Sequence, residues 1–309
     1  MPTYYQLLRR SLVPVSDDKQ RKMKLYSRLL AALAYELPKL LGMGAGSLLA
    51  ITARRLGASI AAGPVEGFNE ALKEISRKTS WSMETYSVND SAVSVIVRDC
   101  PVRQVCMFEG LPIAETVLCR IAKGVIEGYV GKSMGVPVEA EPKAHGPNAC
   151  LYLVRPRSSK RISGASRFHI YREIEEAPEE YARRVLEDLT SLASSLSELV
   201  ERAAGPGAAA ALRLSSKRYG GLRARLHPMT PRLEDAASLL SKELGLDVAV
   251  EAGRLVIKGC PLHGLGRELL CSSVKAFVEG FLSEATGSSV RILGVERGAG
   301  ECVIHLSRR

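Results

Sequence analysis

The chain has 309 residues, of which 46% are hydrophobic and 25% charged, and its net charge is +10. This length is enough for two ordinary domains, each with its own core. The N-terminus lacks the apolar core of a signal peptide, and the most apolar stretch, residues 29–51, is interrupted by Glu36, Pro38 and Lys39. These features exclude a membrane span and lead us to expect a soluble, cytoplasmic protein with no membrane partner.

Amide side chains are scarce, with three asparagines and three glutamines in the whole chain. Depletion of these heat-labile residues beside abundant Arg, Lys and Glu is typical of thermophilic proteins. Because disulfides do form inside some hyperthermophiles, the redox state of the seven cysteines stays open at this point.

The first half begins with an aromatic arm over residues 1–15, followed by apolar residues that recur at intervals of three and four, the period of a helix. Glycines and a Gly63-Pro64 turn separate the helices, and an Asn89-Asp90 turn joins two strands. The predicted elements are helices at 19–41, 47–62 and 65–79, strands at 82–88 and 92–98, a loop after Pro101, a helix at 112–134, and a hairpin over 136–141 and 149–155.

The second half is predicted to repeat this order, beginning with an aromatic arm over residues 168–174. Pro178 occupies the first turn of a long helix, where proline is tolerated, and Gly205-Pro206-Gly207 is expected to break the helix that follows. The predicted elements are helices at 178–203, 208–219, 232–244 and 265–285, strands at 247–252 and 254–258, and a hairpin over 290–306.

An internal repeat underlies this order. Thirty residues separate Cys119 from Cys150, and thirty separate Cys271 from Cys302. The two copies share Lys123 with Lys275, Glu127 with Glu279, Gly128 with Gly280, Gly135 with Gly287 and Val138 with Val290. A repeat of this kind indicates duplication of one unit. We therefore predict a first domain over 1–156, a basic linker over 157–167 and a second, diverged copy over 168–309.

All seven cysteines fall in the repeated cores, and three interpretations of them remain open. They can pack or pair as disulfides, hold zinc with help from a carboxylate or histidine, or hold an iron–sulfur cluster, which prefers four thiolates. The candidate metal ligands are Cys100, Cys119, Glu139, His145 and Cys150 in the first half, and Cys260, Cys271 and Cys302 in the second.

The pattern Cys119-x4-Gly124-x3-Gly128, followed by Gly135-x3-Glu139 and Gly146-x3-Cys150, resembles the 4-vinyl reductase-type hydrocarbon-binding domain. The resemblance covers about residues 20–155, and a weaker copy covers about 178–306. It implies an α/β (α+β) fold, related to nitric-oxide-sensing domains and trafficking-complex subunits, in which an antiparallel sheet and helices enclose an apolar pocket. It also implies a small hydrophobic or aromatic ligand and dimerisation.

In zinc-containing members of that family, the resemblance places ligands at Cys119, Glu139, Cys150 and a further cysteine, which would fall at Pro142 here. For the ligand pocket we predict a lining along one helix, formed by Ile113, Ile121, Val125 and Tyr129. The alternative is that this helix fills a core and leaves no cavity.

We expect a non-enzymatic sensor made of two fused domains, which form an intrachain pseudo-dimer or pair as a homodimer. No phosphate loop, HExxH, GxSxG or nucleotide fingerprint occurs in the sequence. The alternative is a zinc or iron–sulfur redox sensor that regulates transcription through basic patches, since phosphate contacts require such residues. The candidate nucleic-acid-binding residues are Arg155, Arg157, Lys160, Arg161, Arg213, Lys217 and Arg218.

Overall fold

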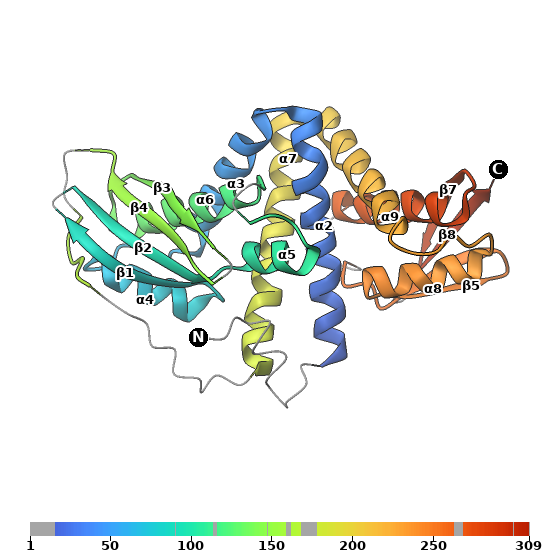
Figure 1. The fold of residues 1–309 in the computed structure, drawn as a ribbon, viewed down its shortest axis with the longest axis horizontal. Coiled ribbons are helices and arrows are strands. Elements are labelled where there is room, and N and C mark those ends of the chain that lie inside the picture. Colours follow the sequence, from blue (N-terminus) through green and yellow to red (C-terminus); the bar gives the residue numbers. More distant parts are fainter. Residues whose placement is uncertain are drawn as a thin grey trace. The chain divides into compact units, whose positions relative to one another are not determined.

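The computed structural model describes residues 16–308 except 90, 114–115, 147, 159–161, 168–177, 263–267 and 299. The two predicted aromatic arms and the candidates Lys160 and Arg161 therefore lie outside the described residues. The described chain is mixed α/β, with helices and two four-stranded antiparallel sheets, as predicted (Figure 1). Within it, no helix is both long enough and apolar enough to cross a membrane.

The order of elements in the first half follows the prediction closely, apart from one added helix. The elements are α2 (Asp17–Leu41), α3 (Gly44–Ile60), α4 (Phe68–Lys78), β1 (Ser82–Asn89), β2 (Ala92–Asp99), α5 (Pro101–Glu109), α6 (Cys119–Met134), β3 (Val138–His145) and β4 (Cys150–Pro156). The second half contains α7 (Pro178–Ala224), α8 (Leu233–Leu244), β5 (Asp247–Glu251), β6 (Arg254–Lys258), α9 (Glu268–Thr286), β7 (Val290–Arg297) and β8 (Glu301–Arg308).

Several predicted boundaries were wrong: the helix predicted over 112–134, for example, begins at Cys119. The loop predicted after the second strand contains α5, which has Pro101 in its first turn and ends at Gly110 with a left-handed φ of 68°. Both are ordinary helix-end signals. In the second half, α7 continues through Gly205-Pro206-Gly207. The alanines on both sides of this sequence are the strongest helix formers, which offsets the poor helix propensity of glycine and proline.

The chain forms two compact units, and each contains a helix from the opposite half of the sequence. Unit 1 contains Met43–Leu196, and unit 2 contains Asp17–Gly42 together with Ser197–Arg309. Helix α2, from the first half, thus belongs to unit 2, and the first part of α7 belongs to unit 1. The domain limits predicted from the sequence follow the repeat, whereas these units follow the packing.

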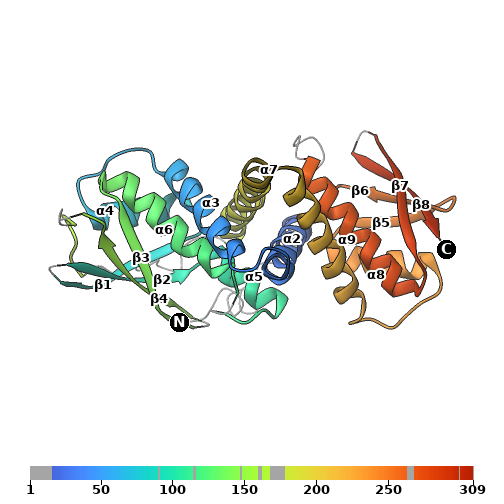
Figure 2. The ribbon, with the colours of Figure 1, turned by 90° about the horizontal axis from the view of Figure 1, so that it is seen from above.

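In unit 1 the sheet has the strand order β1-β2-β4-β3. Helices α4 and α6 pack on the sheet, and α3 packs against α6 (Figure 2). Helices α3 and α6 approach so closely at Gly128 that a Cβ there would overlap the carbonyl oxygen of Arg54. Glu127 connects the layers: its side chain pairs with Arg54 and accepts a hydrogen bond from the backbone N–H of Ala140 at 3.1 Å.

Unit 2 repeats this construction, with the strand order β5-β6-β8-β7. A Cβ at Gly280 in α9 would overlap the carbonyl oxygen of Lys217 in α7. Glu279 pairs with Lys217 and accepts a hydrogen bond from the backbone N–H of Ile292 at 3.2 Å. Gly280, Glu279 and Lys217 in unit 2 therefore make the same kinds of contact as Gly128, Glu127 and Arg54 in unit 1.

The helix contributed by the other half of the sequence is part of each core. In unit 2, Leu25, Leu30 and Leu37 of α2 are at most 1% exposed. In unit 1, Ala182 and Val185 of α7 are equally buried. Burial of this extent stabilises each leucine or valine side chain by roughly 1.5–3 kcal/mol. Neither unit has a complete core without its contributed helix.

Candidate thiol site

Four cysteines from three separate parts of the chain meet in unit 1. Cys100 follows β2 and caps the N-terminus of α5, Cys106 lies within α5, Cys119 begins α6 and Cys150 begins β4. The thiols of Cys106 and Cys119 are hydrogen-bonded to each other, and Cys100 and Cys150 act electrostatically on the same group. The fold thus gathers three of the predicted metal ligands, Cys100, Cys119 and Cys150, and adds Cys106.

The cluster is mostly shielded from solvent. Cys100, Cys106 and Cys150 are at most 7% exposed, Cys119 is half-buried, and none of the four is in a disulfide. Burial raises the pKa of the Cys100 thiol to about 12. The hydrogen bond to Cys119, and then burial, raise the pKa of the Cys106 thiol well above its ordinary value. At neutral pH these two side chains are therefore protonated.

His145 and Tyr152 border the cluster. His145 is the cross-strand partner of Cys150, and the partners in such a pair point to the same face of the sheet. The His145 ring meets Tyr152 edge-on, with 5.8 Å between ring centroids. The Nδ1 atom of His145 is buried without a hydrogen-bond partner, and burial, followed by Arg120, lowers the pKa of the imidazole. A neutral imidazole nitrogen is therefore left without a partner beside the thiols.

Glu139 is not part of this group. It pairs across the strands with Arg155, whereas Cys150 pairs with His145, so strand alternation puts Glu139 on the opposite face of the sheet from Cys150. The Glu139 side chain is 57% exposed and lies 4.0 Å from Lys123 Nζ. Of the metal ligands predicted in the first half, Glu139 alone points away from the cluster.

Sequence reasoning left Cys106 out of the candidate ligand set because it falls in the segment predicted as a loop. Two signals would have found it: Pro101 after Cys100 and Gly110 nine residues later, which frame a short helix. As the side chains stand, no group of three or more His, Cys, Asp or Glu in the described part of the chain is arranged to hold a metal ion.

Unit 2 holds three cysteines in a different setting. Cys260, Cys271 and Cys302 are all half-buried, and none of them is in a disulfide. Cys302 on β8 pairs across the strands with Arg297, the position that His145 occupies in unit 1. Burial raises the pKa of the Cys271 thiol, Cys302 acts in the same direction, and Arg297 and Lys275 act against it.

The residues predicted to line an apolar pocket are packed in the core of unit 1. Ile121, Val125 and Tyr129 are 0% exposed. The backbone of Val125 and Tyr129 contacts Gly57 of α3, and the Tyr129 hydroxyl donates to Glu74 at 2.9 Å. Ile113 lies outside this helix, in the half-buried segment before α6. The face of α6 predicted to border a ligand is thus occupied by α3 and by Glu74.

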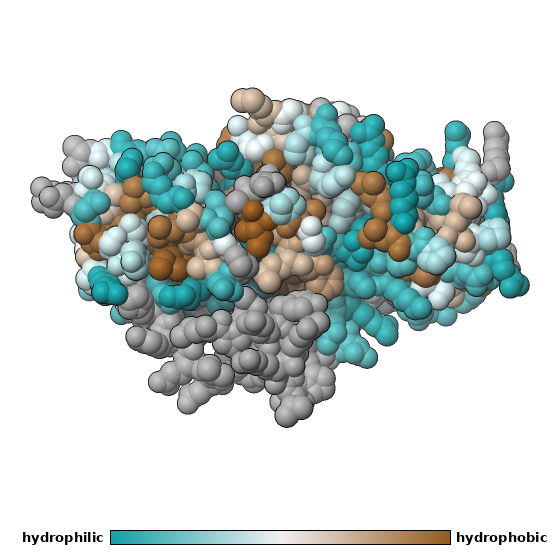
Figure 3. Space-filling view, in the orientation of Figure 1, coloured by the Kyte–Doolittle hydropathy of each residue, from teal (hydrophilic) through white to brown (hydrophobic). Residues whose placement is uncertain are grey.

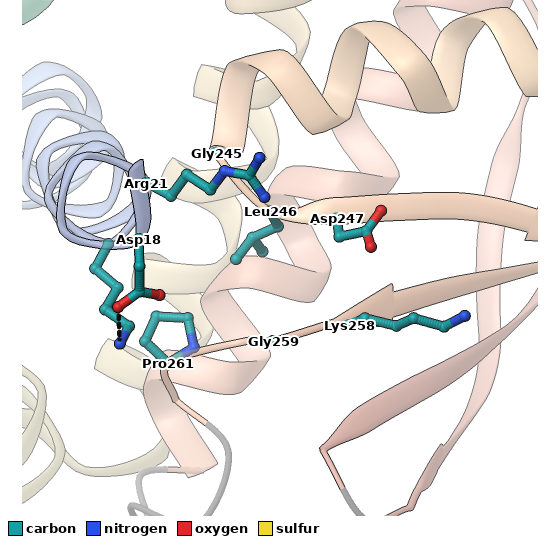
Figure 4. Close-up of a pocket in the computed structure, with 9 residues that line it drawn as sticks. Asp18, Arg21, Gly245, Leu246, Asp247, Lys258, Gly259 and Pro261 are labelled. Atoms are coloured by element: carbon teal, nitrogen blue, oxygen red, sulfur yellow. Dashed lines mark hydrogen bonds and ion pairs between the residues drawn. The ribbon is translucent and has the colours of Figure 1, made fainter. Parts of the chain in front are cut away.

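A groove of about 260 Å³ lies in unit 2, where α2 meets the ends of β5 and β6 (Figure 4). Five of the nine residues that line it are charged. Arg21 extends beside Gly245 and Leu246, Asp18 pairs with Lys22, and Asp247 and Lys258 line the far end. The charges of both signs along this groove do not suit a hydrocarbon ligand.

Most candidate nucleic-acid-binding residues are paired with carboxylates. Lys217 pairs with Glu279, and Arg218 lies 3.4 Å from Glu36. Arg155 lies 3.7 Å from Glu141, and Arg157 lies 3.9 Å from Glu127. Arg213 is exposed. On the face drawn in Figure 3, hydrophilic and apolar surfaces are interspersed. Nucleic-acid binding stays a prediction, with less unpaired positive charge than the sequence indicated.

No protein-family model and no curated protein matches this chain.

Proposed function

We propose that this protein is a non-enzymatic sensor, and that the four-thiol cluster of unit 1 is its sensing site, where a thiophilic metal ion binds. The observation that carries the proposal is the convergence of Cys100, Cys106, Cys119 and Cys150 from three parts of the chain into one group that is mostly buried. Cysteines that serve only as small hydrophobes have no reason to gather in this way.

The donor set suits a soft cation in kind and in number. Four thiolates complete the tetrahedral shell of a structural zinc ion and are also the usual ligands of an iron–sulfur cluster. His145 adds a buried nitrogen without a partner on the same face of the sheet. Because the ligands have to lose their protons and rearrange before they bind a metal, we expect uptake of the metal to release protons and to strengthen as the pH rises.

Duplication of one ancestral domain is part of the proposal. It is supported by the shared strand order of the two sheets and by the equivalent roles of Glu127 and Glu279. The 4-vinyl reductase-type resemblance leads to the same reading of a regulatory rather than catalytic protein. A hydrophobic ligand has less support, because α3 and Glu74 occupy the face of α6 predicted to border it.

The test is a metal analysis of protein purified without oxygen, followed by titration with Co²⁺ as a spectroscopic probe. We expect about one metal ion per chain and the strong visible absorption of tetrahedral cobalt–thiolate coordination. The Cys106→Ser variant should lose this absorption, and the matched control Cys260→Ser, in unit 2, should keep it. Failure of the wild-type chain to bind Co²⁺ or Zn²⁺ at micromolar concentration would contradict the proposal.

A further inference from the structure

Unit 2 carries a second pair of thiols, placed by the same framework that places two of the thiols in unit 1. Glu279 lies eight residues after Cys271 in α9, as Glu127 lies eight residues after Cys119 in α6. Each glutamate is held by a backbone N–H of the edge strand. Cys150 and Cys302 each lie near the start of the second strand of the closing hairpin. Cys150 on β4 is opposite Val97 on β2, and Cys302 on β8 is opposite Ile257 on β6. Cys271 and Cys302 therefore occupy the positions of Cys119 and Cys150.

The surroundings of the second pair differ in ways that favour reaction over metal binding. The sequence has no cysteine between Cys260 and Cys271, so unit 2 has no counterpart of Cys106. Both Cys271 and Cys302 are half-buried, whereas the cluster in unit 1 is mostly sealed. Arg297 and Lys275 provide positive charge beside Cys271. Reactive cysteines typically lie in partly exposed, electropositive surroundings of this kind.

We propose that Cys271 and Cys302 form a redox-active dithiol, which hydroperoxides oxidise to a disulfide linking α9 to β8. The Cys271 thiolate attacks the terminal oxygen of the hydroperoxide and the O–O bond breaks, giving a sulfenic acid at Cys271 and an alcohol, or water when the oxidant is hydrogen peroxide. The Cys302 sulfur then attacks that sulfur. The S–S bond forms, the S–O bond breaks, and the hydroxide leaves as water with the proton of Cys302.

Two electrons pass from the two thiols to one hydroperoxide, so no further reductant or oxidant is required. Burial raises the pKa of the Cys271 thiol, and Arg297 and Lys275 oppose that rise. Cys271 is assigned the first attack because these two cations lie beside it. The proposal extends the proposed sensor function to a second site and does not depend on metal binding in unit 1. The two sites would respond to different chemical classes, a soft cation in unit 1 and a peroxide in unit 2.

The test uses the full chain, purified and fully reduced without oxygen, then treated with hydrogen peroxide at a slight excess over protein. Remaining thiols are blocked with iodoacetamide, and disulfides are located by mass spectrometry of peptides. We expect a Cys271–Cys302 disulfide that dithiothreitol reverses. It should form in the Cys260→Ser and Cys106→Ser variants as well, so loss of the metal site and loss of the dithiol remain distinguishable.

The Cys302→Ser variant checks the order of events. Without its partner, Cys271 should accumulate as the sulfenic acid, which dimedone traps as a single adduct. Circular dichroism of each variant confirms that it has folded. The proposal is overturned if peroxide leaves Cys271 and Cys302 as thiols in the wild-type chain, or if it joins cysteines of unit 1 while these two stay reduced.

Discussion

Arg28 in α2 and Glu243 in α8 form an ion pair almost completely removed from solvent, with 3.0 Å between Arg28 Nη2 and Glu243 Oε2. Arg28 Nε also donates to the backbone carbonyl oxygen of Glu243 at 3.2 Å. Arg223 and His227 contact the same carboxylate, at 2.8 and 3.0 Å. This carboxylate therefore fixes α2, a helix of the first half of the sequence, to the part of unit 2 that the second half provides.

Replacing Arg28 should strongly destabilise unit 2. Arg28→Met removes one partner of a buried pair, and such changes typically cost about 3–5 kcal/mol; we expect the lower end because Arg223 and His227 remain beside Glu243. Urea unfolding followed by circular dichroism measures the loss. The matched control is Arg225→Met, which breaks the exposed pair with Glu284 and should leave stability unchanged. Equal effects in the two variants would contradict this view of α2.

The carboxyl of Asp188 should make stability depend on pH. It accepts hydrogen bonds from the backbone N–H of Ser80 at 2.7 Å and from the Ser80 hydroxyl at 2.5 Å. Burial raises its pKa from 3.8 to about 6, with Glu187 acting in the same direction and Arg184 against it. Because the folded chain binds this proton more tightly than the unfolded chain, the free energy of unfolding should fall as the pH rises through this range.

The expected fall is about 3 kcal/mol between pH 4 and pH 6, with no further contribution from this group at higher pH. Urea unfolding at several pH values measures it. In Asp188→Asn this part of the pH dependence should disappear, because the amide oxygen still accepts from Ser80 but does not titrate. A variant that keeps the wild-type slope would show that other groups are responsible.

The close packing of α3 on α6 should not tolerate a methyl group at Gly128. An added Cβ overlaps the Arg54 carbonyl oxygen, so Gly128→Ala forces the helices apart and should cost about 1–3 kcal/mol. The control is Gly44→Ala at the start of α3, where the added Cβ meets no atom within 4 Å. There the higher helix propensity of alanine should leave stability unchanged or slightly improved. Thermal unfolding of both variants distinguishes packing from propensity.

The exchange of helices predicts that the two halves of the chain stay together after the linker is cut. A protease site placed in residues 157–167 allows cleavage of the folded protein. Because each unit contains a helix from the other half, the fragments should co-elute on size exclusion in native buffer and separate only in denaturant. Separation in native buffer would show that each half retains its own helix.

The sequence predicted most helices and strands correctly because their apolar periodicity reflects burial directly. The α2 pattern of Leu25, Leu29, Leu33 and Leu37 identifies a helix with one buried face. It does not say which sheet that face packs on, since a leucine stripe fits either of two similar cores. The exchange of α2 and α7 was therefore not predictable from periodicity.

Only part of the thiol site was predicted, because the sequence pattern identifies some of its cysteines and not others. Cys119 and Cys150 were recognised from their repeated spacing, and Cys100 from its place after a strand. Cys106 has no counterpart in the second half, and its position depends on α5, a helix too short to show a clear period. The pairing of His145 with Cys150 depends on the bulge in β3 between Pro142 and Ala144, which changes the register of the strand beyond it.

Unit 2 combines segments that lie far apart in the sequence, and this has a consequence for synthesis of the protein. Helix α2 leaves the ribosome well before its partners in unit 2, which begin only at Ser197. During that interval the apolar face of α2 has no native surface to cover it, while unit 1 becomes complete once the first part of α7 has emerged. Nascent chains with long-delayed contacts of this kind are prone to aggregate. We therefore expect α2 to be the segment that a chaperone binds, and unit 2 to be the last part of the chain to acquire its native structure.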